Sequence, residues 1–112
     1  MLLNETTSSA IATNVRYAET WWERVAGFIP RSSIGREEGL WFRRCSAIHT
    51  LFMRAGIDVL FLDSDRRIIE MHANVRPNRL VLSCFGATHV VELGTGAIAA
   101  RRLRVGDRIR LV

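Results

Sequence analysis

Lysine is absent from the 112 residues, so all 16 basic side chains are arginines. Cysteine is scarce: Cys45 and Cys84 are too few for a disulfide-stapled scaffold, and in a reducing compartment both are expected as free thiols. No apolar run reaches the roughly 18 residues that a membrane-spanning helix needs. The first residues also lack the basic stretch and apolar core of a secretory signal. These absences predict a cytoplasmic protein without membrane association.

The composition is typical of one globular domain. With 48% hydrophobic and 24% charged residues in 12.7 kDa, the chain can bury about two thirds of its surface and needs no metal or disulfide to hold its core. We expect a single domain over residues 1–112, in which about the first nine residues form a loose tail or strand.

The charge balance is basic, with a net charge of +5 and a pI near 10.9. Such an excess raises the possibility of a nucleic-acid partner. The densest basic region is interrupted by apolar residues, and an arginine-biased composition explains it equally well. RNA binding is therefore kept as a disfavoured alternative, which would use Arg101, Arg102, Arg104, Arg108 and Arg110.

Runs of β-branched and aromatic residues bounded by turn residues dominate the chain. The strongest predicted strand covers residues 57–63, and the polar turn 64–66 leads into a second strand over 67–73, which together predict a β-hairpin. Six or seven strands at about ten-residue spacing predict a mainly β fold, a compact barrel or sandwich. One short helix is expected over 21–28 and a brief helical turn over 97–103.

Two sets of residues could indicate a bound cofactor or metal, but neither has the surrounding sequence that such a site needs. Gly94-Thr95-Gly96-Ala97-Ile98-Ala99 fits a dinucleotide-binding loop, but the chain ends before a βαβ unit could be completed, so no nucleotide cofactor is expected. A metal site could be built from His49, His72 and His89 with Asp58 or Glu92. None of these residues shows compact ligand spacing, so we expect isolated histidines and no metal.

Two carboxyls and one thiol are candidates for chemistry. Asp58 and Glu92 stand within apolar runs, so each must be hydrogen-bonded or ion-paired if it is buried. A structural ion pair and a polar pocket floor remain equally open, with partners available from Arg24, Arg43, Arg44 and Arg54. Cys45 and His49 would lie about 13 Å apart on an extended segment, so the thiol is better interpreted as a small buried hydrophobe than as a nucleophile.

Several short motifs follow one another along the chain: Arg24-x-x-Gly27-Phe28, Glu38-Gly39-Leu40-Trp41-Phe42, the run from Cys45 to Met53, the run from Ile57 to Asp63, Val91-Glu92-Leu93, Gly94-x-Gly96 and Gly106-Asp107. From about Arg24 onward the chain resembles domain of unknown function 192, an uncharacterised conserved region of bacteria and archaea. The resemblance implies a β-rich barrel or sandwich with one short helix near the N-terminus. It also implies a shared surface of His49, Thr50, Met53, Asp58 and Phe61, with Arg24 and Glu92 as neighbours, and it implies no activity.

We therefore predict a conserved bacterial protein that binds a small polar ligand, a saccharide or a peptide, in a cleft formed by residues 49–53 and 58–61. The predicted ligand-binding residues are Arg24, His49, Thr50, Met53, Asp58, Phe61 and Glu92. The alternative is a hydrolase that uses Cys45 with His49, or Asp58 with Glu92 as paired carboxylates. The oligomeric state is left open.

Overall fold

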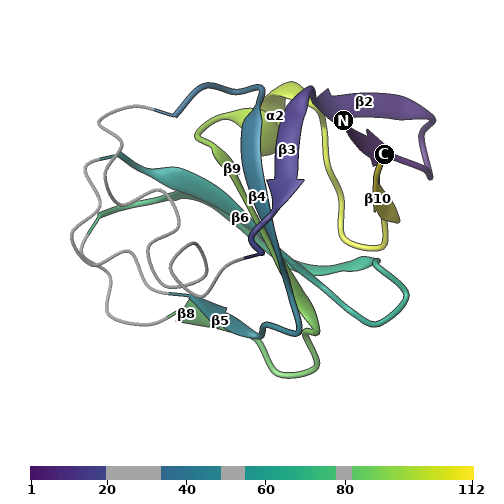
Figure 1. Cartoon of the computed structure of the whole chain (residues 1–112), viewed down its shortest axis with the longest axis vertical. Coiled ribbons are helices and arrows are strands. Elements are labelled where there is room, and N and C mark those ends of the chain that lie inside the picture. Colours follow the sequence, from purple (N-terminus) through teal and green to yellow (C-terminus); the bar gives the residue numbers. More distant parts are fainter. Residues whose placement is uncertain (20–33, 49–54, 78–81) are drawn as a thin grey trace.

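The computed structural model describes residues 1–19, 34–48, 55–77 and 82–112. In these ranges the chain forms ten strands and one short helix (Figure 1). The elements are β1 (Leu2–Asn4), β2 (Ser9–Ala12), β3 (Asn14–Tyr17), β4 (Glu38–Arg43), β5 (Ala47–Ile48), β6 (Ile57–Leu62), β7 (Ile68–Val75), β8 (Leu82–Ser83), β9 (His89–Gly94), α2 (Ala97–Ala100) and β10 (Ile109–Leu111). The prediction of a mainly β fold is confirmed.

A five-stranded sheet in the order β3-β4-β9-β6-β7 forms the centre of the molecule. Every residue of β6 is buried, because β6 has a neighbour on each side and is covered on both faces. This explains why residues 57–62 are a nearly continuous apolar run instead of an alternating one. The β6–β7 pairing confirms the hairpin expected from the sequence.

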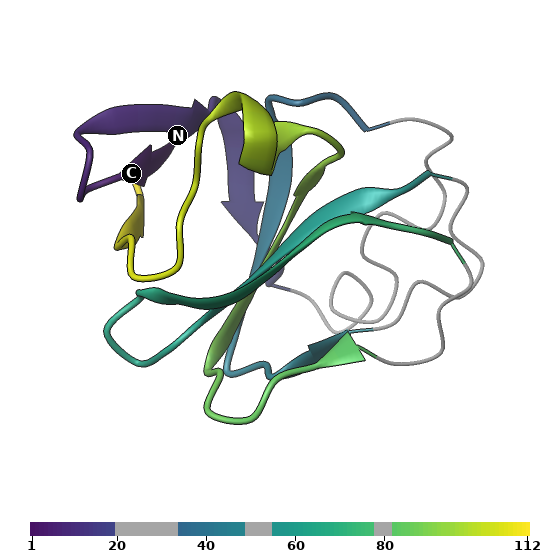
Figure 2. The same cartoon turned by 180° about the vertical axis from the view of Figure 1, so that it is seen from behind.

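We call the two sides of this sheet the first face and the second face. The first face carries Trp41, Leu60, Leu62, Val91 and Leu93, and it packs against a three-stranded sheet in the order β10-β1-β2 and against α2. Figure 2 shows α2 and this smaller sheet gathered at one end of the molecule. Within the described ranges, no helix is long and apolar enough to cross a membrane.

The second face carries Leu40, Phe42, Val59, Phe61 and Val90. The short ribbon formed by β5 and β8 contributes to the apolar cluster on this side through Ile48 and Leu82. The sheets are layered on one another and do not close into a barrel, so the sandwich form of the prediction is the one observed.

Two local expectations need correction. The N-terminal residues are not loose, because β1 is the middle strand of the small sheet and Leu2 and Asn4 are buried. Residues 10–18 carry their apolar and aromatic side chains close to alternately, a pattern that predicts one half-buried strand. The segment is instead divided near Thr13 into β2 and β3, which belong to different sheets. The consecutive burial of Ile11 and Ala12 is a pattern that one half-buried strand does not produce.

The helical turn expected over 97–103 is present as α2, while the helix expected over 21–28 lies outside the described residues. Residues 63–67 connect the two strands of the hairpin, β6 and β7. Arg66 adopts a left-handed conformation with φ of 64° and donates its backbone N–H to the Asp63 carbonyl at 3.0 Å. The turn therefore forms at the conformational cost that a non-glycine residue carries there.

Candidate functional site

Four of the seven predicted ligand-binding residues lie outside the described residues: Arg24, His49, Thr50 and Met53. The other three, Asp58, Phe61 and Glu92, lie on the two central strands β6 and β9 and are almost completely buried. What they can do therefore depends on which face of the sheet each one occupies.

Asp58 lies on the first face and is fully satisfied. Its Oδ1 accepts the backbone N–H of Asn74 at 2.9 Å, and its Oδ2 accepts the backbone N–H of Ile98 at 2.9 Å. The first bond holds an irregular point of β7, where Asn74 has φ of 52°, and the second holds the first turn of α2. Asp58 therefore joins three elements, and backbone N–H groups supply its partners where an arginine was expected.

Glu92 lies on the second face, where its register partners are Leu40 of β4 and Val59 of β6. Its side chain is 4% exposed, and Oε2 has no hydrogen-bond partner among the described residues. Burial raises the pKa of this carboxyl to about 8. Below that pH the group is mainly a neutral acid, which can both donate and accept a hydrogen bond.

The sheet separates the two carboxyls. Asp58 is opposite Leu93 in the β6–β9 register, and Glu92 is one position away on the other face. Paired carboxylates in glycoside hydrolysis must flank one scissile bond, which groups on opposite faces of a packed sheet cannot do. The hydrolase alternative based on Asp58 and Glu92 is therefore wrong.

Phe61 belongs to the second face together with Glu92, so the predicted cleft cannot contain both Phe61 and Asp58. The structure adds two neighbours that the sequence analysis did not select. The His72 ring meets the Phe61 ring edge-on at 5.9 Å between centroids, and His72 Nε2 lies 2.6 Å from Glu70 Oε2. The signal was present in the sequence, since residues 70 and 72 are two apart and share one side of a strand.

The two described histidines, His72 and His89, do not lie at one site. His72 lies on the second face, whereas His89 lies beside Trp41, whose indole N–H donates to His89 Nδ1 at 3.1 Å. Burial is the main cause that lowers the pKa of His89, followed by the positive charges of Arg66 and Arg43. In the described ranges, no three His, Cys, Asp or Glu side chains form a group that could hold a metal ion.

The thiols lie at the margin of the second-face cluster. The Cys45 Sγ donates to the Ala47 carbonyl at 3.1 Å, and its predicted partner His49 lies outside the described residues. For Cys84, burial and then the nearby Glu70 carboxylate raise the thiol pKa. A raised pKa disfavours the thiolate, so the environment of Cys84 is not that of an activated nucleophile.

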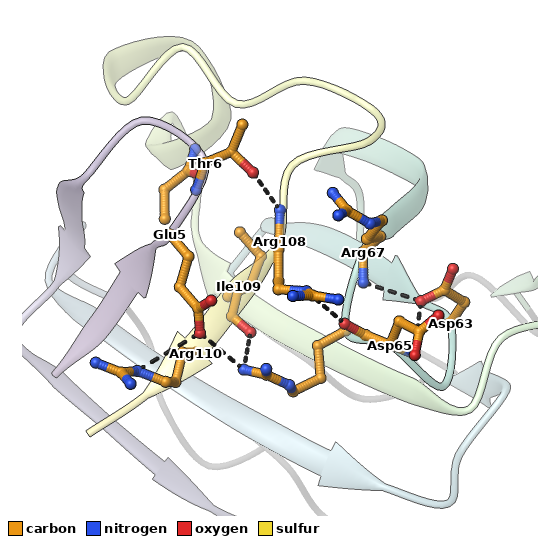
Figure 3. Close-up of polar contacts among 10 residues, drawn as sticks. Glu5, Thr6, Asp63, Asp65, Arg67, Arg108, Ile109 and Arg110 are labelled. Atoms are coloured by element: carbon orange, nitrogen blue, oxygen red, sulfur yellow. Dashed lines mark hydrogen bonds and ion pairs between the residues drawn. The ribbon is translucent and has the colours of Figure 1, made fainter.

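Several C-terminal arginines are engaged within the fold, and Figure 3 shows two of them, Arg108 and Arg110. Glu5 Oε1 forms ion pairs with Arg66 Nη1 at 3.1 Å and with Arg110 Nε at 3.5 Å. Arg108 Nε donates a hydrogen bond to the Asp65 carbonyl at 3.2 Å. Arg101 bonds Glu37 at 2.5 Å and the Ile11 carbonyl at 3.0 Å. Of the five arginines that the RNA-binding alternative would use, three therefore have contacts within the fold: Arg101, Arg108 and Arg110.

The chain was compared with known proteins. It is 32% identical to a UPF0127 protein of Pyrococcus furiosus over 96% of this chain and 95% of the relative, and 30% identical to one of Thermococcus sibiricus over 97% and 73%. These relatives are archaeal, so they do not confirm the bacterial origin predicted from the sequence. Neither name states an activity.

Two crystal structures share the fold. A protein of unknown function from Novosphingobium aromaticivorans matches with a TM-score of 0.78 and 27% identity over 87% of this chain and 74% of that one. A proposed transcription regulator from Sinorhizobium meliloti matches with a TM-score of 0.77 and 24% identity over 86% and 79%, a likeness that concerns the fold alone. The family described as "Uncharacterized ACR, COG1430" matches residues 3–111, which extends the resemblance to β1. The chain therefore belongs to this family, domain of unknown function 192.

Proposed function

We propose that the protein binds a small polar ligand, a saccharide or a short peptide, on the second face of its central sheet, and that Glu92 anchors it. One observation carries the proposal: Oε2 of Glu92 is buried and has no hydrogen-bond partner among the described residues. An unsatisfied buried carboxyl lowers the stability of the fold by about 1–3 kcal/mol. Groups retained at such a cost are typical of binding and catalytic sites.

The chemistry of Glu92 favours a neutral ligand. With a pKa of about 8, the carboxyl is mostly protonated at neutral pH, so it matches hydroxyl and amide groups better than a cation. The half-buried His72 lies on the same face, edge-on to the buried Phe61 ring, and aromatic side chains are common in the lining of small-molecule sites. Asp58 has no part in this proposal, because both of its oxygens are already engaged.

Substitution of Glu92 separates a binding role from a structural one. In Glu92→Leu the unsatisfied polar group is gone, so the free protein should be at least as stable as the wild type while ligand binding is lost. In the matched control Glu92→Gln, the side chain keeps its shape and its capacity to donate and accept, so binding should remain within a few-fold of the wild type.

The measurement is a thermal-shift screen with neutral disaccharides and capped tripeptides at pH 7, since a ligand of the native state raises the melting temperature. A shift that is present in the wild type and in Glu92→Gln but absent in Glu92→Leu is the expected result. Either of two results overturns the proposal: no shift with any probe in folded wild-type protein, or a Glu92→Leu variant that is clearly less stable than the wild type.

A further inference from the structure

A hollow of about 410 Å³ lies on the small sheet formed by β1, β2 and β10. All three strands and the turn between β1 and β2 contribute to its lining, and all of its lining residues belong to the described ranges. The residues used in the argument below are Leu3, Glu5, Ser8, Ser9, Ala10 and Arg110. The volume is within the range of small-molecule sites. The hollow and the second-face site proposed above are on different sheets, so they are separate places for a ligand.

The floor of the hollow is the outward side of the small sheet. In the strand register, Leu3 of β1 lies between Arg110 of β10 and Ala10 of β2. Leu2 and Asn4, on either side of Leu3 in the chain, are buried toward the core. Ala10 and the two serines before it have short side chains, which leaves the space above Leu3 open. The floor is therefore apolar in its middle and positively charged at one end.

The Arg110 guanidinium is held along one edge only. Its Nε lies 3.5 Å from Glu5 Oε1, while its two terminal nitrogens have no partner among the described residues. Figure 3 shows the far end of this guanidinium turned away from Glu5. The side chain is 54% exposed, so the terminal nitrogens are open to a ligand.

The surrounding contacts fix Glu5 beside β10. Arg66 Nη1 donates to Glu5 Oε1 and to the Ile109 carbonyl, both at 3.1 Å. Thr6 Oγ1 accepts the backbone N–H of Arg108 at 2.9 Å, which ties the turn after β1 to the chain that leads into β10. The charged groups are therefore arranged before a ligand arrives, and such preorganisation lowers the ordering cost of binding.

We propose that this hollow binds a small organic monoanion, a carboxylate with an aliphatic body. The terminal nitrogens of Arg110 form the pair of parallel donors that a carboxylate accepts. Two guanidinium groups and one carboxylate leave one positive charge at the site, which a single carboxylate neutralises and a phosphate dianion exceeds. Leu3 and Ala10 give the aliphatic body an apolar contact, and the hydroxyls of Ser8 and Ser9 supply polar groups at the rim.

The probe is N-acetylleucine, which has one carboxylate and one aliphatic side chain. In an NMR titration of the wild-type protein, it should shift the amides of Leu3, Ala10 and Arg110. N-acetylleucine amide lacks the charge and should bind at least about tenfold more weakly. Acetate lacks the aliphatic body and should also bind at least about tenfold more weakly. Inorganic phosphate should bind more weakly than N-acetylleucine for both reasons of charge and shape.

Two substitutions remove the site in different ways. Arg110→Gln removes the charged donors, and Ala10→Leu fills the hollow from β2, so each should weaken binding of N-acetylleucine at least about tenfold. Arg104→Gln is the matched control, since it removes the same charge from an exposed arginine that does not line the hollow. Its effect should stay within about twofold, because salt screens exposed charges outside the site. Glu92→Leu should leave this binding unchanged, which distinguishes the hollow from the second-face site.

Three results overturn the proposal: no shift in the amides of the hollow, equal binding of the acid and its amide, or tighter binding of phosphate than of N-acetylleucine. Equal losses in Arg104→Gln and Arg110→Gln also overturn it, because they would show general attraction of anions to a basic protein. Both altered side chains of the site are exposed, so the variants should fold, as circular dichroism would verify. If Arg110→Gln does not fold, Ala10→Leu alone decides, and unchanged binding in that variant overturns the proposal.

Discussion

Asp58 and Glu92 occupy adjacent strands of one sheet, one on each face, and both carboxyls are nearly inaccessible at 0% and 4% exposure. On the first face, two backbone N–H groups converge on Asp58 and hold β7 and α2 in place. On the second face, Oε2 of Glu92 meets no donor among the described residues. The comparison teaches that burial of a charged residue type does not by itself indicate function, because the state of its hydrogen bonds separates a structural carboxyl from a candidate site.

Removal of the Asp58 carboxylate should have the largest effect. In Asp58→Ala, the N–H groups of Asn74 and Ile98 lose their acceptors, and hydrogen bonds to a charged group contribute about 1.5–3 kcal/mol each. We expect the free energy of unfolding to fall by about 4 kcal/mol, as measured by urea denaturation.

Asp58→Asn is the matched control, since it keeps one acceptor oxygen at the same place and should lose roughly half as much stability. Hydrogen exchange gives an independent readout, because the amides of Asn74 and Ile98 should exchange faster in both variants than in the wild type. A cost below about 1 kcal/mol for Asp58→Ala would contradict the structural role assigned to the first-face carboxyl.

The pH dependence of stability should reveal the second-face carboxyl. Glu92 has an ordinary pKa of 4.5 in the unfolded chain, whereas burial raises its pKa to about 8 in the folded chain. Between these values the folded state retains a proton that the unfolded state has lost. The contribution of Glu92 to the free energy of unfolding is therefore most favourable below the lower pKa. It declines as the pH rises toward 8, with a slope of up to about 1.4 kcal/mol per pH unit.

The experiment compares urea unfolding of the wild type and of Glu92→Gln at several values between about pH 5 and about pH 8.5. Glutamine does not titrate, so the difference between the two curves isolates Glu92 from the other acidic groups. A wild-type curve that falls more steeply than the variant's is expected. Parallel curves would mean that the second face solvates the carboxylate as well as water does.

The difference between the faces could be only partly predicted from the sequence. Asp58 and Phe61 are three residues apart on one strand, and the two-residue period of a strand already places them on opposite sides. Their joint assignment to one cleft was therefore avoidable. The relation of Asp58 to Glu92 was not avoidable in this way, because it depends on the β6–β9 register, which places Asp58 opposite Leu93 from a distant part of the chain.

The partners of Asp58 were equally inaccessible from the sequence. An acidic residue in an apolar run predicts a partner, and arginine is the commonest candidate. The actual donors are a backbone irregularity at Asn74 and the first turn of α2, which no side-chain pattern encodes. By contrast, the β6–β7 hairpin and the mainly β class follow from local composition and turn residues, so both were predicted correctly.

The smallest change in stability is expected at Thr88, and its substitution tests whether polar groups on the second face lack hydrogen-bond partners. Its Oγ1 is buried without a partner among the described residues, and Thr88 directly precedes β9, between Ala87 and Val90 of the second-face cluster. Thr88→Val replaces the hydroxyl by a methyl group of similar size, so stability should stay the same or rise by less than about 1 kcal/mol. Thr88→Ser, which keeps the hydroxyl and loses the methyl, should instead be destabilised by about 1 kcal/mol. If valine costs more than serine, the hydroxyl has a structural partner, and the second face would resemble the satisfied first face.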